Sequence, residues 1–128
     1  MTTQTMKAFL RLQAQGLPHE VFSVAFLDVR NRLIAYERMF RGSLTTTAVH
    51  PREVARQALL HNAAAVVLHH NHPGGSCEPS LADLTLTYTL RSALALVEVH
   101  VLDHIITSDE AALSMTEAGY LVGACRVR

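Results

Sequence analysis

The apolar residues in the first third of the chain follow a helical spacing and then a strand-like one. Apolar positions three and four residues apart predict a helix over residues 5–15, which a glycine and a proline end. Residues 21–28 and 33–40 are apolar runs rich in β-branched and aromatic residues, and a polar stretch around Asn31 separates them. This pattern predicts two antiparallel strands joined by a turn. Residues 45–47 are predicted to form a loop or an edge strand.

The rest of the chain alternates helical and strand-like patterns. The run at residues 63–69 is apolar throughout, which is typical of a strand in the middle of a sheet with both faces covered. The predicted elements are a helix over residues 51–62, a strand over 63–69, a Pro- and Gly-rich loop over 71–79, a helix over 80–96, a strand over 97–107, and a short strand, a turn and a small final element in the last twenty residues. This order predicts a single α/β domain with a mixed β-sheet flanked by helices.

Length and composition fit one globular domain spanning residues 1–128. The chain is 49% hydrophobic and 17% charged, which is typical of a protein with a real core. Eleven basic residues balance eleven acidic ones, and this zero net charge counts against nucleic acid as a partner, since DNA binders usually show a basic face. The two cysteines, Cys77 and Cys125, are too few for a disulfide framework. With no visible signal peptide or membrane span, we expect a reduced, cytoplasmic setting.

Histidines gather after the apolar run. Of the eight histidines in the chain, His69, His70 and His72 fall within four positions. Since alternate residues of an extended chain project to the same side, His70 and His72 point the same way and His69 points to the opposite face. Asp83 follows His72 by eleven residues, in the first turn of a predicted helix. Two imidazoles and one carboxylate with an open fourth position form the arrangement expected of a catalytic zinc site, with one ion per chain.

Each part of this pattern also has a structural explanation. Ser80 and Asp83 have the spacing of a capping box with Ser80 as the N-cap, and this motif alone favours a structural role. Two histidines separated by one residue are a weak signal, because surface histidines are common. Packing does not readily explain a histidine pair at a strand end, a glycine-rich loop and a carboxylate at a helix start together. The combination therefore favours a metal site.

The spacing of these residues resembles the signature of a metalloprotease family. His70, Asn71 and His72 are followed by seven residues, Ser80, two residues and Asp83, which resembles the H-x-H-x7-S-x2-D signature of the JAMM (MPN+) family. Within residues 20–121, flanking residues resemble the JAB/MPN-like domain of the bacterial RadC branch; they are Pro51-Arg52-Glu53-Val54, Pro73, Pro79 and Asp103-His104. The resemblance implies an MPN/JAB-like, cytidine-deaminase-like architecture and zinc-dependent hydrolysis. A zinc deaminase is set aside because no His-x-Glu is paired with Pro-Cys-x-x-Cys.

The resemblance also implies two catalytic residues. A glutamate on the first strand of the family matches Glu20, which would take a proton from the activated water and later deliver it to the leaving amine. Spacing alone does not select Glu20 over Glu37 or Glu53, and an exposed glutamate beside a strand is the plainer interpretation. Ser80 matches the motif serine and would donate a hydrogen bond to the oxyanion of the tetrahedral intermediate. A role of Ser80 as N-cap is compatible with this.

Three functions follow from these observations. The first is a zinc metalloprotease that hydrolyses a peptide or isopeptide bond in an unidentified protein or peptide substrate. The second is a DNA-repair-associated, RadC-like protein in which the fold is a platform, and the neutral charge counts against it. The third is an inactive MPN scaffold or binding module, and the retained ligand residues count against that. A homodimer through an apolar surface stays open.

The chain departs from the RadC pattern in a few places. RadC-type proteins usually carry an N-terminal region with a helix-hairpin-helix-like segment, whereas this chain has one short helix there. We expect either a stand-alone catalytic-type domain or part of a longer chain. Gly74 stands where the family often has serine, and Cys77 stands where polar residues are usual, but neither change removes a ligand. For Asp103-His104, a strand position supporting the sheet is preferred over a contact behind a metal ligand.

Overall fold

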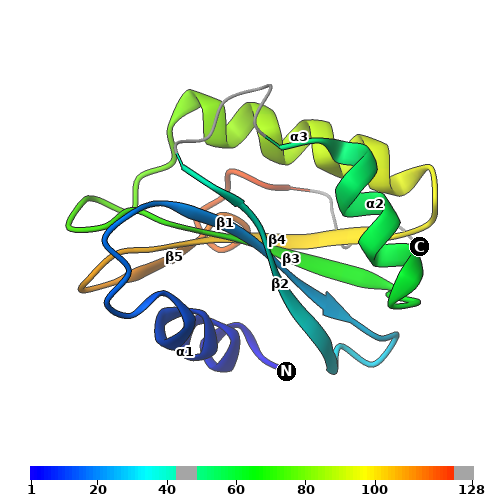
Figure 1. The fold of residues 1–128 in the computed structure, drawn as a ribbon, viewed down its shortest axis with the longest axis horizontal. Helices are drawn as coiled ribbons and strands as arrows, with labels where there is room; N and C mark the ends of the chain where they lie inside the picture. The colour runs from blue at the N-terminus through cyan, green and yellow to red at the C-terminus, as the bar shows by residue number, and fades with distance from the viewer. Residues whose placement is uncertain (43–48, 123–128) are drawn as a thin grey trace.

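The computed structural model describes residues 1–42 and 49–122. The elements are α1 (Thr3–Ala14), β1 (Val21–Leu27), β2 (Leu33–Arg41), α2 (Pro51–Leu60), β3 (Ala65–Asn71), α3 (Leu81–Ala95), β4 (His100–Thr107) and β5 (Ala112–Ser114). The strands form one sheet in the order β2-β1-β3-β4-β5, in which β3 and β4 run parallel and the other neighbours antiparallel. Helix α1 covers one face of this sheet, and α2 and α3 cover the other (Figure 1). The expectation of an α/β domain with a mixed sheet is confirmed.

The predicted helices and strands up to β5 match the observed ones, with shifts at their ends. The turn predicted near the end of the chain lies at residues 115–119, and the small final element falls partly on residues 123–128, which are outside the described residues. Asn31, in the predicted turn between β1 and β2, has a φ of 60°, a left-handed conformation that asparagine tolerates well. The last long strand begins at His100 and not at residue 97, because Glu98 has a φ of 62° and belongs to the turn that follows α3. The loop or edge strand predicted at residues 45–47 lies outside the described residues, as does Cys125.

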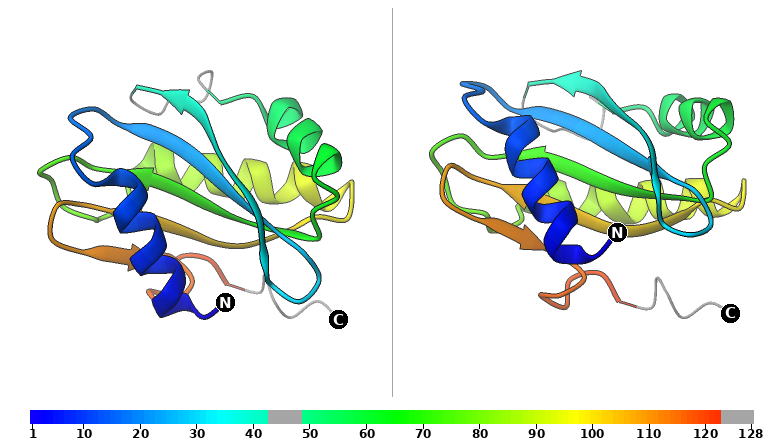
Figure 2. Two further views of the ribbon diagram at one scale, coloured as in Figure 1. Left: turned by 60° about the horizontal axis from the view of Figure 1, so that its bottom comes forward. Right: turned by 90° about the horizontal axis from the view of Figure 1, so that it is seen from below.

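Two apolar clusters lie on the two faces of the sheet. Strands β1 and β3 are buried along their whole length, as expected for the apolar run in the middle of the chain. One cluster packs under α2 and α3 and includes Phe22 and Leu90, both fully buried. The other packs under α1, which lies across the sheet (Figure 2) and contributes Met6 and Leu10. Burial of each such side chain stabilises the fold by about 1.5–3 kcal/mol.

The strand connections bring three chain segments to one edge of the sheet. Strands β3 and β4 are parallel, so the chain must cross between them, and α3 makes this crossing. The start of α3 therefore lies near the end of β3. Strand β1 is antiparallel to β3 and pairs Phe22 with His70, so the start of β1 lies at the same edge. The functional candidates are found there.

Asp103, inside β4, connects this strand to β5 and to the turn that follows β5. Its carboxylate accepts hydrogen bonds from the Ser114 hydroxyl (2.5 Å), the Thr116 backbone N–H (3.0 Å) and the His104 backbone N–H (2.8 Å). Burial raises the pKa of Asp103, and these hydrogen bonds oppose the rise. The structural role preferred for Asp103 from the sequence agrees with these contacts.

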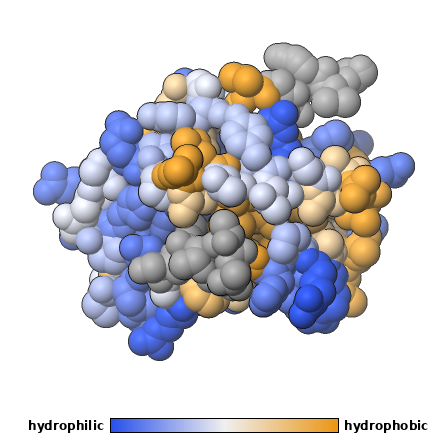
Figure 3. All heavy atoms as spheres, turned by 90° about the horizontal axis from the view of Figure 1, so that it is seen from above, coloured by the Kyte–Doolittle hydropathy of each residue, from blue (hydrophilic) through white to orange (hydrophobic). Residues whose placement is uncertain are grey.

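Exposed apolar side chains are distributed over the surface. On the face covered by α2 and α3, hydrophobic residues occur in several groups with hydrophilic residues between them (Figure 3). The large exposed ones include Leu59, Leu60 and Leu96, and single exposed apolar residues are ordinary on protein surfaces. A homodimer through such a surface stays a prediction. Within the described residues, no helix is both long and apolar enough to cross a membrane.

Candidate metal centre

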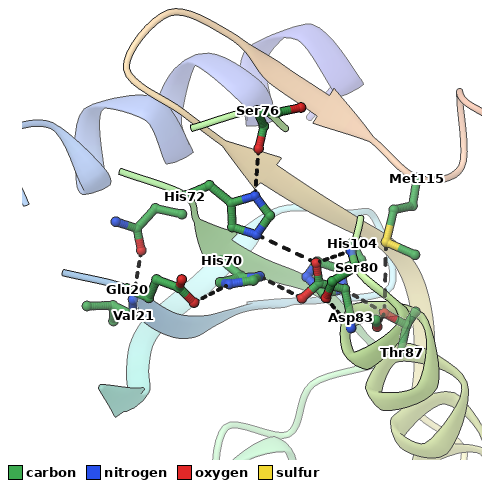
Figure 4. A network of polar contacts seen from close by, with 11 residues as sticks. Glu20, Val21, His70, His72, Ser76, Ser80, Asp83, Thr87, His104 and Met115 are labelled. Atoms are coloured by element: carbon green, nitrogen blue, oxygen red, sulfur yellow. Dashed lines mark hydrogen bonds and ion pairs between the residues drawn. The ribbon is translucent and has the colours of Figure 1, made fainter. Parts of the chain in front are cut away.

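His70, His72 and Asp83 converge where β3 ends and α3 begins (Figure 4). His70 lies inside β3 and is paired with Phe22 of β1 and Ile106 of β4, so strands on both sides hold its backbone. His72 follows the strand by one residue, and its ring lies 4.5 Å from that of His70 between centroids. The two imidazoles therefore share one face of the sheet, as the alternation of an extended chain predicts.

The glycine-rich loop returns the chain to the end of the strand. The His72 backbone N–H donates to the Thr107 carbonyl (2.7 Å), so the pairing of β3 with β4 extends into the loop. The Gly75 N–H then donates back to the His72 carbonyl (3.1 Å). Between them Gly74 has a φ of 63°, which glycine adopts without the steric cost of a side chain. The first turn of α3, with Asp83, consequently faces the two histidines.

The three side chains are close enough to hold one ion. One candidate ligand atom from each of His70, His72 and Asp83 lies within 4.8 Å of the others. The closest approaches are 3.2 Å between His70 Nδ1 and Asp83 Oδ1 and 3.6 Å between His72 Nε2 and Asp83 Oδ2. Among the described residues, this is the group of three or more histidine, cysteine or acidic side chains that are close enough to bind one ion.

Two atoms of the cluster are buried without a hydrogen-bond partner. They are His70 Nδ1 and Asp83 Oδ1, which face each other at 3.2 Å without the geometry of a hydrogen bond, and their residues are 1% and 0% exposed. An unsatisfied buried polar atom is costly, at about 1–3 kcal/mol, and native structures usually contain few of them. A cation with nitrogen and oxygen ligands would satisfy both atoms at once. The residues present therefore fit a bound metal ion.

The other histidine is oriented for the same role. His72 Nδ1 lies 2.7 Å from the Ser76 carbonyl, which can only accept, so this nitrogen carries the proton and donates it. In the neutral imidazole, the form that binds a metal, the remaining nitrogen Nε2 then has a free lone pair, and it is the nitrogen that faces Asp83. Metal-ligating histidines usually make such a hydrogen bond with their second nitrogen. Two imidazoles and a carboxylate suit zinc and also accept other divalent ions.

Asp83 combines the metal-facing position with a role in capping the helix. Its Oδ2 accepts from the Ser80 backbone N–H (2.8 Å), and its own backbone N–H donates to the Ser80 hydroxyl (3.0 Å). The capping box expected from the sequence is thus confirmed. Burial raises the pKa of Asp83, but the contacts with His70, His72 and the Ser80 N–H outweigh burial and hold the pKa well below its usual range. Asp83 is therefore a carboxylate at neutral pH.

Glu20 lies on the opposite side of His70 from Asp83 (Figure 4). Its Oε1 is 3.1 Å from His70 Nε2, and its side chain is about one-third exposed. The other glutamates that spacing allowed have different partners. Glu37 contacts His61 (3.0 Å), and Glu53 contacts Arg56 (3.2 Å).

Asn71, the residue between the two candidate histidines, connects the segment that carries Glu20 to β3. Asn71 Oδ1 accepts from the Val21 backbone N–H (2.7 Å), and Asn71 Nδ2 donates to the His19 carbonyl (3.0 Å). These bonds hold the backbone on both sides of Glu20. The position of an asparagine between two candidate ligands was the only hint of this role in the sequence. Its hydrogen-bond partners are 50 and 52 residues away, so the sequence did not identify them.

Three other residues lie near the cluster without belonging to it. His69 points to the face covered by α1, as expected, and is buried between the Tyr36 hydroxyl (2.9 Å) and the Thr107 hydroxyl (3.0 Å). Cys77 is half-buried in the loop and packs against the apolar cluster under α2 and α3. Thr87, which the sequence did not single out, lies behind Asp83 on α3. The sequence did contain a hint of this position, because residues four apart, such as Asp83 and Thr87, lie on the same side of a helix.

Two buried histidines predict that acid lowers the stability of the protein. Burial lowers the pKa of His69 and of His104 from 6.5 to about 3. Below about pH 6.5 the unfolded chain therefore binds protons that the folded chain does not. The free energy of unfolding should fall on acidification, by up to about 1.4 kcal/mol per pH unit for each such histidine. Urea unfolding of the zinc-free protein from about pH 7 to pH 4.5 measures this.

A His69→Gln variant provides the control for this prediction. The slope of its unfolding free energy against pH should be smaller than that of the wild type by up to about 1.4 kcal/mol per pH unit, the contribution of one proton. The comparison cancels the opposite contribution of His72, whose pKa the neighbouring Asp83 raises. Equal slopes in the two proteins would contradict the assignment of His69 as a buried neutral imidazole.

The fold and this cluster together define a class of protein: a small α/β domain with a His-His-Asp cluster at the end of its central strand. Residues 1–120 match the family described as RadC-like JAB domain, and the chain belongs to this family. The resemblance to the RadC branch noted from the sequence is thereby confirmed. The JAB family includes metalloproteases, and the cluster is compatible with that activity.

Curated relatives are similar over most of this chain. The UPF0758 protein of Acidovorax sp. (strain JS42) is 60% identical over 116 residues, which are 91% of this chain and 49% of the relative. The UPF0758 protein of Polaromonas sp. (strain JS666 / ATCC BAA-500) is 57% identical over 120 residues, which are 94% of this chain and 54% of the relative. The chain thus spans about half the length of these relatives. Their name states no activity.

Proposed function

We propose that this chain binds one zinc ion through His70, His72 and Asp83 and hydrolyses an amide bond in a protein or peptide substrate. The observation that carries the proposal is the pair of buried ligand atoms, His70 Nδ1 and Asp83 Oδ1, which face each other without a hydrogen bond, beside the lone pair of neutral His72 at Nε2. Membership of the RadC-like JAB family supports it. The cytoplasmic setting expected from the composition stays a prediction.

The proposed chemistry is addition of water to the amide carbonyl, followed by loss of the amine. Zinc, when bound, polarises a carbonyl oxygen and lowers the pKa of a bound water to about 7. Glu20 is the proposed general base. Its carboxylate is partly exposed and lies 3.1 Å from His70, so it can take a proton from the attacking water and return it to the nitrogen as the C–N bond breaks.

Ser80 is the proposed donor to the oxyanion. Its hydroxyl oxygen accepts the Asp83 N–H, which leaves the hydroxyl proton free to be donated. One hydroxyl can thus cap α3 and stabilise the developing negative charge at the same time, since accepting and donating use different parts of the group. Loss of one such donor typically lowers kcat by about 10²–10³-fold.

Elemental analysis of the purified chain tests the metal site. The wild type, dialysed after zinc is supplied, is expected to hold about one zinc per chain, because the site offers three ligands and an open position. The His70→Ala, His72→Ala double variant should hold none. The matched control is a His50→Ala, His100→Ala double variant, since both residues are exposed. A wild type without metal would turn this domain into a scaffold and reject the hydrolase.

A further inference from the structure

We propose that Thr87 and His104 form a buried support behind Asp83 that sets the metal affinity of the site. Thr87 and His104 are both fully buried, on α3 and β4 respectively. The inference rests on the proposed zinc site but concerns residues that do not ligate. Both are positioning residues that act through the backbone of Asp83.

The support is a chain of hydrogen bonds. The Thr87 hydroxyl donates to the Asp83 carbonyl (2.7 Å) and lies 2.6 Å from His104 Nδ1. A hydroxyl has one proton to give, and the Asp83 carbonyl receives it, because this oxygen is a nearer and stronger acceptor than the Met115 sulfur at 3.9 Å. His104 Nδ1 must then be the donor to the Thr87 oxygen. The order of donation is therefore His104 to Thr87 to Asp83.

These hydrogen bonds connect the first turn of α3, which carries Asp83, to β4, the neighbour of the strand that carries His70. His104 pairs with Leu68 of β3, which lies two residues before His70. The side chains of His104 and His70 are therefore on the same face of the sheet. The His104 ring lies 6.1 Å from that of His70 between centroids. Thr87 lies on the far side of Asp83 from Glu20 (Figure 4). The first turn of α3 is thus held at a set distance from the two histidines.

Apolar packing alone would define the distance between the first turn of α3 and the two histidines less closely than these hydrogen bonds do. The surrounding helix positions are apolar, including Leu86 and Leu90, and their contacts lack direction. Hydrogen bonds fix a direction and a length, and the contact of His104 Nδ1 with Thr87 satisfies one of the two ring nitrogens, whereas His104 Nε2 is buried without a partner. Groups that orient metal ligands from behind typically change metal affinity about 10–100-fold when they are removed. We expect an effect of this size from the loss of the Thr87 hydroxyl.

The test compares two substitutions of one residue. Thr87→Val removes the hydroxyl and keeps the side-chain shape, whereas Thr87→Ser keeps the hydroxyl and removes a methyl group. Zinc affinity, measured by competition with a chromophoric chelator, should fall about 10–100-fold in Thr87→Val and change by less than about threefold in Thr87→Ser. Urea unfolding of the zinc-free proteins is measured in parallel. Thr89→Val, the same change at an exposed position of α3, is the matched control and should bind zinc like the wild type.

The cobalt-loaded proteins provide a spectroscopic readout. The visible absorption of bound Co²⁺ reports the arrangement of the ligands, so it should shift in Thr87→Val and return to the wild-type form in Thr87→Ser. His104→Leu, which removes the Nδ1 donor, should resemble Thr87→Val. Wild-type affinity in Thr87→Val, or equal losses in Thr87→Val and Thr87→Ser, would overturn the inference while leaving the proposed function intact. A wild type that binds no zinc would reject both.

Discussion

The Asp83→Ala variant is expected to lose its zinc. Asp83 supplies the anionic ligand, and it is buried between His70 and His72. Removing one partner from a buried charged contact costs about 3–5 kcal/mol. If this cost appears in metal binding, the affinity falls by roughly 10²–10⁴-fold. Zinc content after dialysis and a chelator competition titration measure the loss.

Two further variants separate metal binding from helix capping. Asp83→Asn keeps an oxygen that can accept the Ser80 N–H, but it lacks the negative charge, so it should bind zinc weakly and stay nearly as stable as the wild type. Ser80→Ala loses the cap, which should cost about 1 kcal/mol of stability, yet it keeps all three ligands. Its zinc content should equal that of the wild type. An Asp83→Asn protein with full zinc affinity would exclude this carboxylate as a ligand.

The Glu20→Gln variant is expected to keep its zinc and lose turnover. Glutamine has nearly the shape of glutamate and still reaches His70, but its amide does not act as a base at neutral pH. General acid–base catalysis contributes about 10²–10⁴-fold, so kcat should fall by this factor. The assay uses the fluorogenic peptide or isopeptide that the wild type cleaves fastest in a panel, and zinc content is measured on the same samples.

The other glutamates serve as controls for this experiment. Glu53→Gln and Glu37→Gln make the same chemical change at residues that contact Arg56 and His61. Both variants should retain wild-type turnover. Full activity in Glu20→Gln would show that another group takes the proton. Loss of zinc from Glu20→Gln would instead make Glu20 part of the metal site.

Asp83 shows how two interpretations of one residue can both hold. From the sequence, the capping box and the metal ligand were alternatives. In the structure the two oxygens of the carboxylate have different roles, because Oδ2 accepts the Ser80 N–H and Oδ1 faces His70 Nδ1 without a hydrogen bond. Capping orients the carboxylate without using the oxygen that a metal would need. The helix terminus therefore contributes to the arrangement of the site.

Local patterns in the sequence were enough to predict most of the elements and the three candidate ligands. An uninterrupted apolar run at residues 63–69 has the character of a central strand, and β3 is buried on both faces. His70 and His72 share a face because side chains alternate along any extended chain. Ser80 and Asp83 mark a helix start through their own local hydrogen bonds. These features depend on neighbours within a few residues, which the order of residues specifies directly.

Contacts between these ligands and residues far away in the sequence depend on the tertiary structure. Glu20 approaches His70, 50 residues away, because β1 and β3 pair in one particular register. A shift of that register by one residue would turn every side chain of β1 to the other face of the sheet. The contact of Thr87 with His104 likewise arises where α3 packs on β4. Strand register and helix packing are set by the whole apolar core, so no local pattern of residues specifies these contacts.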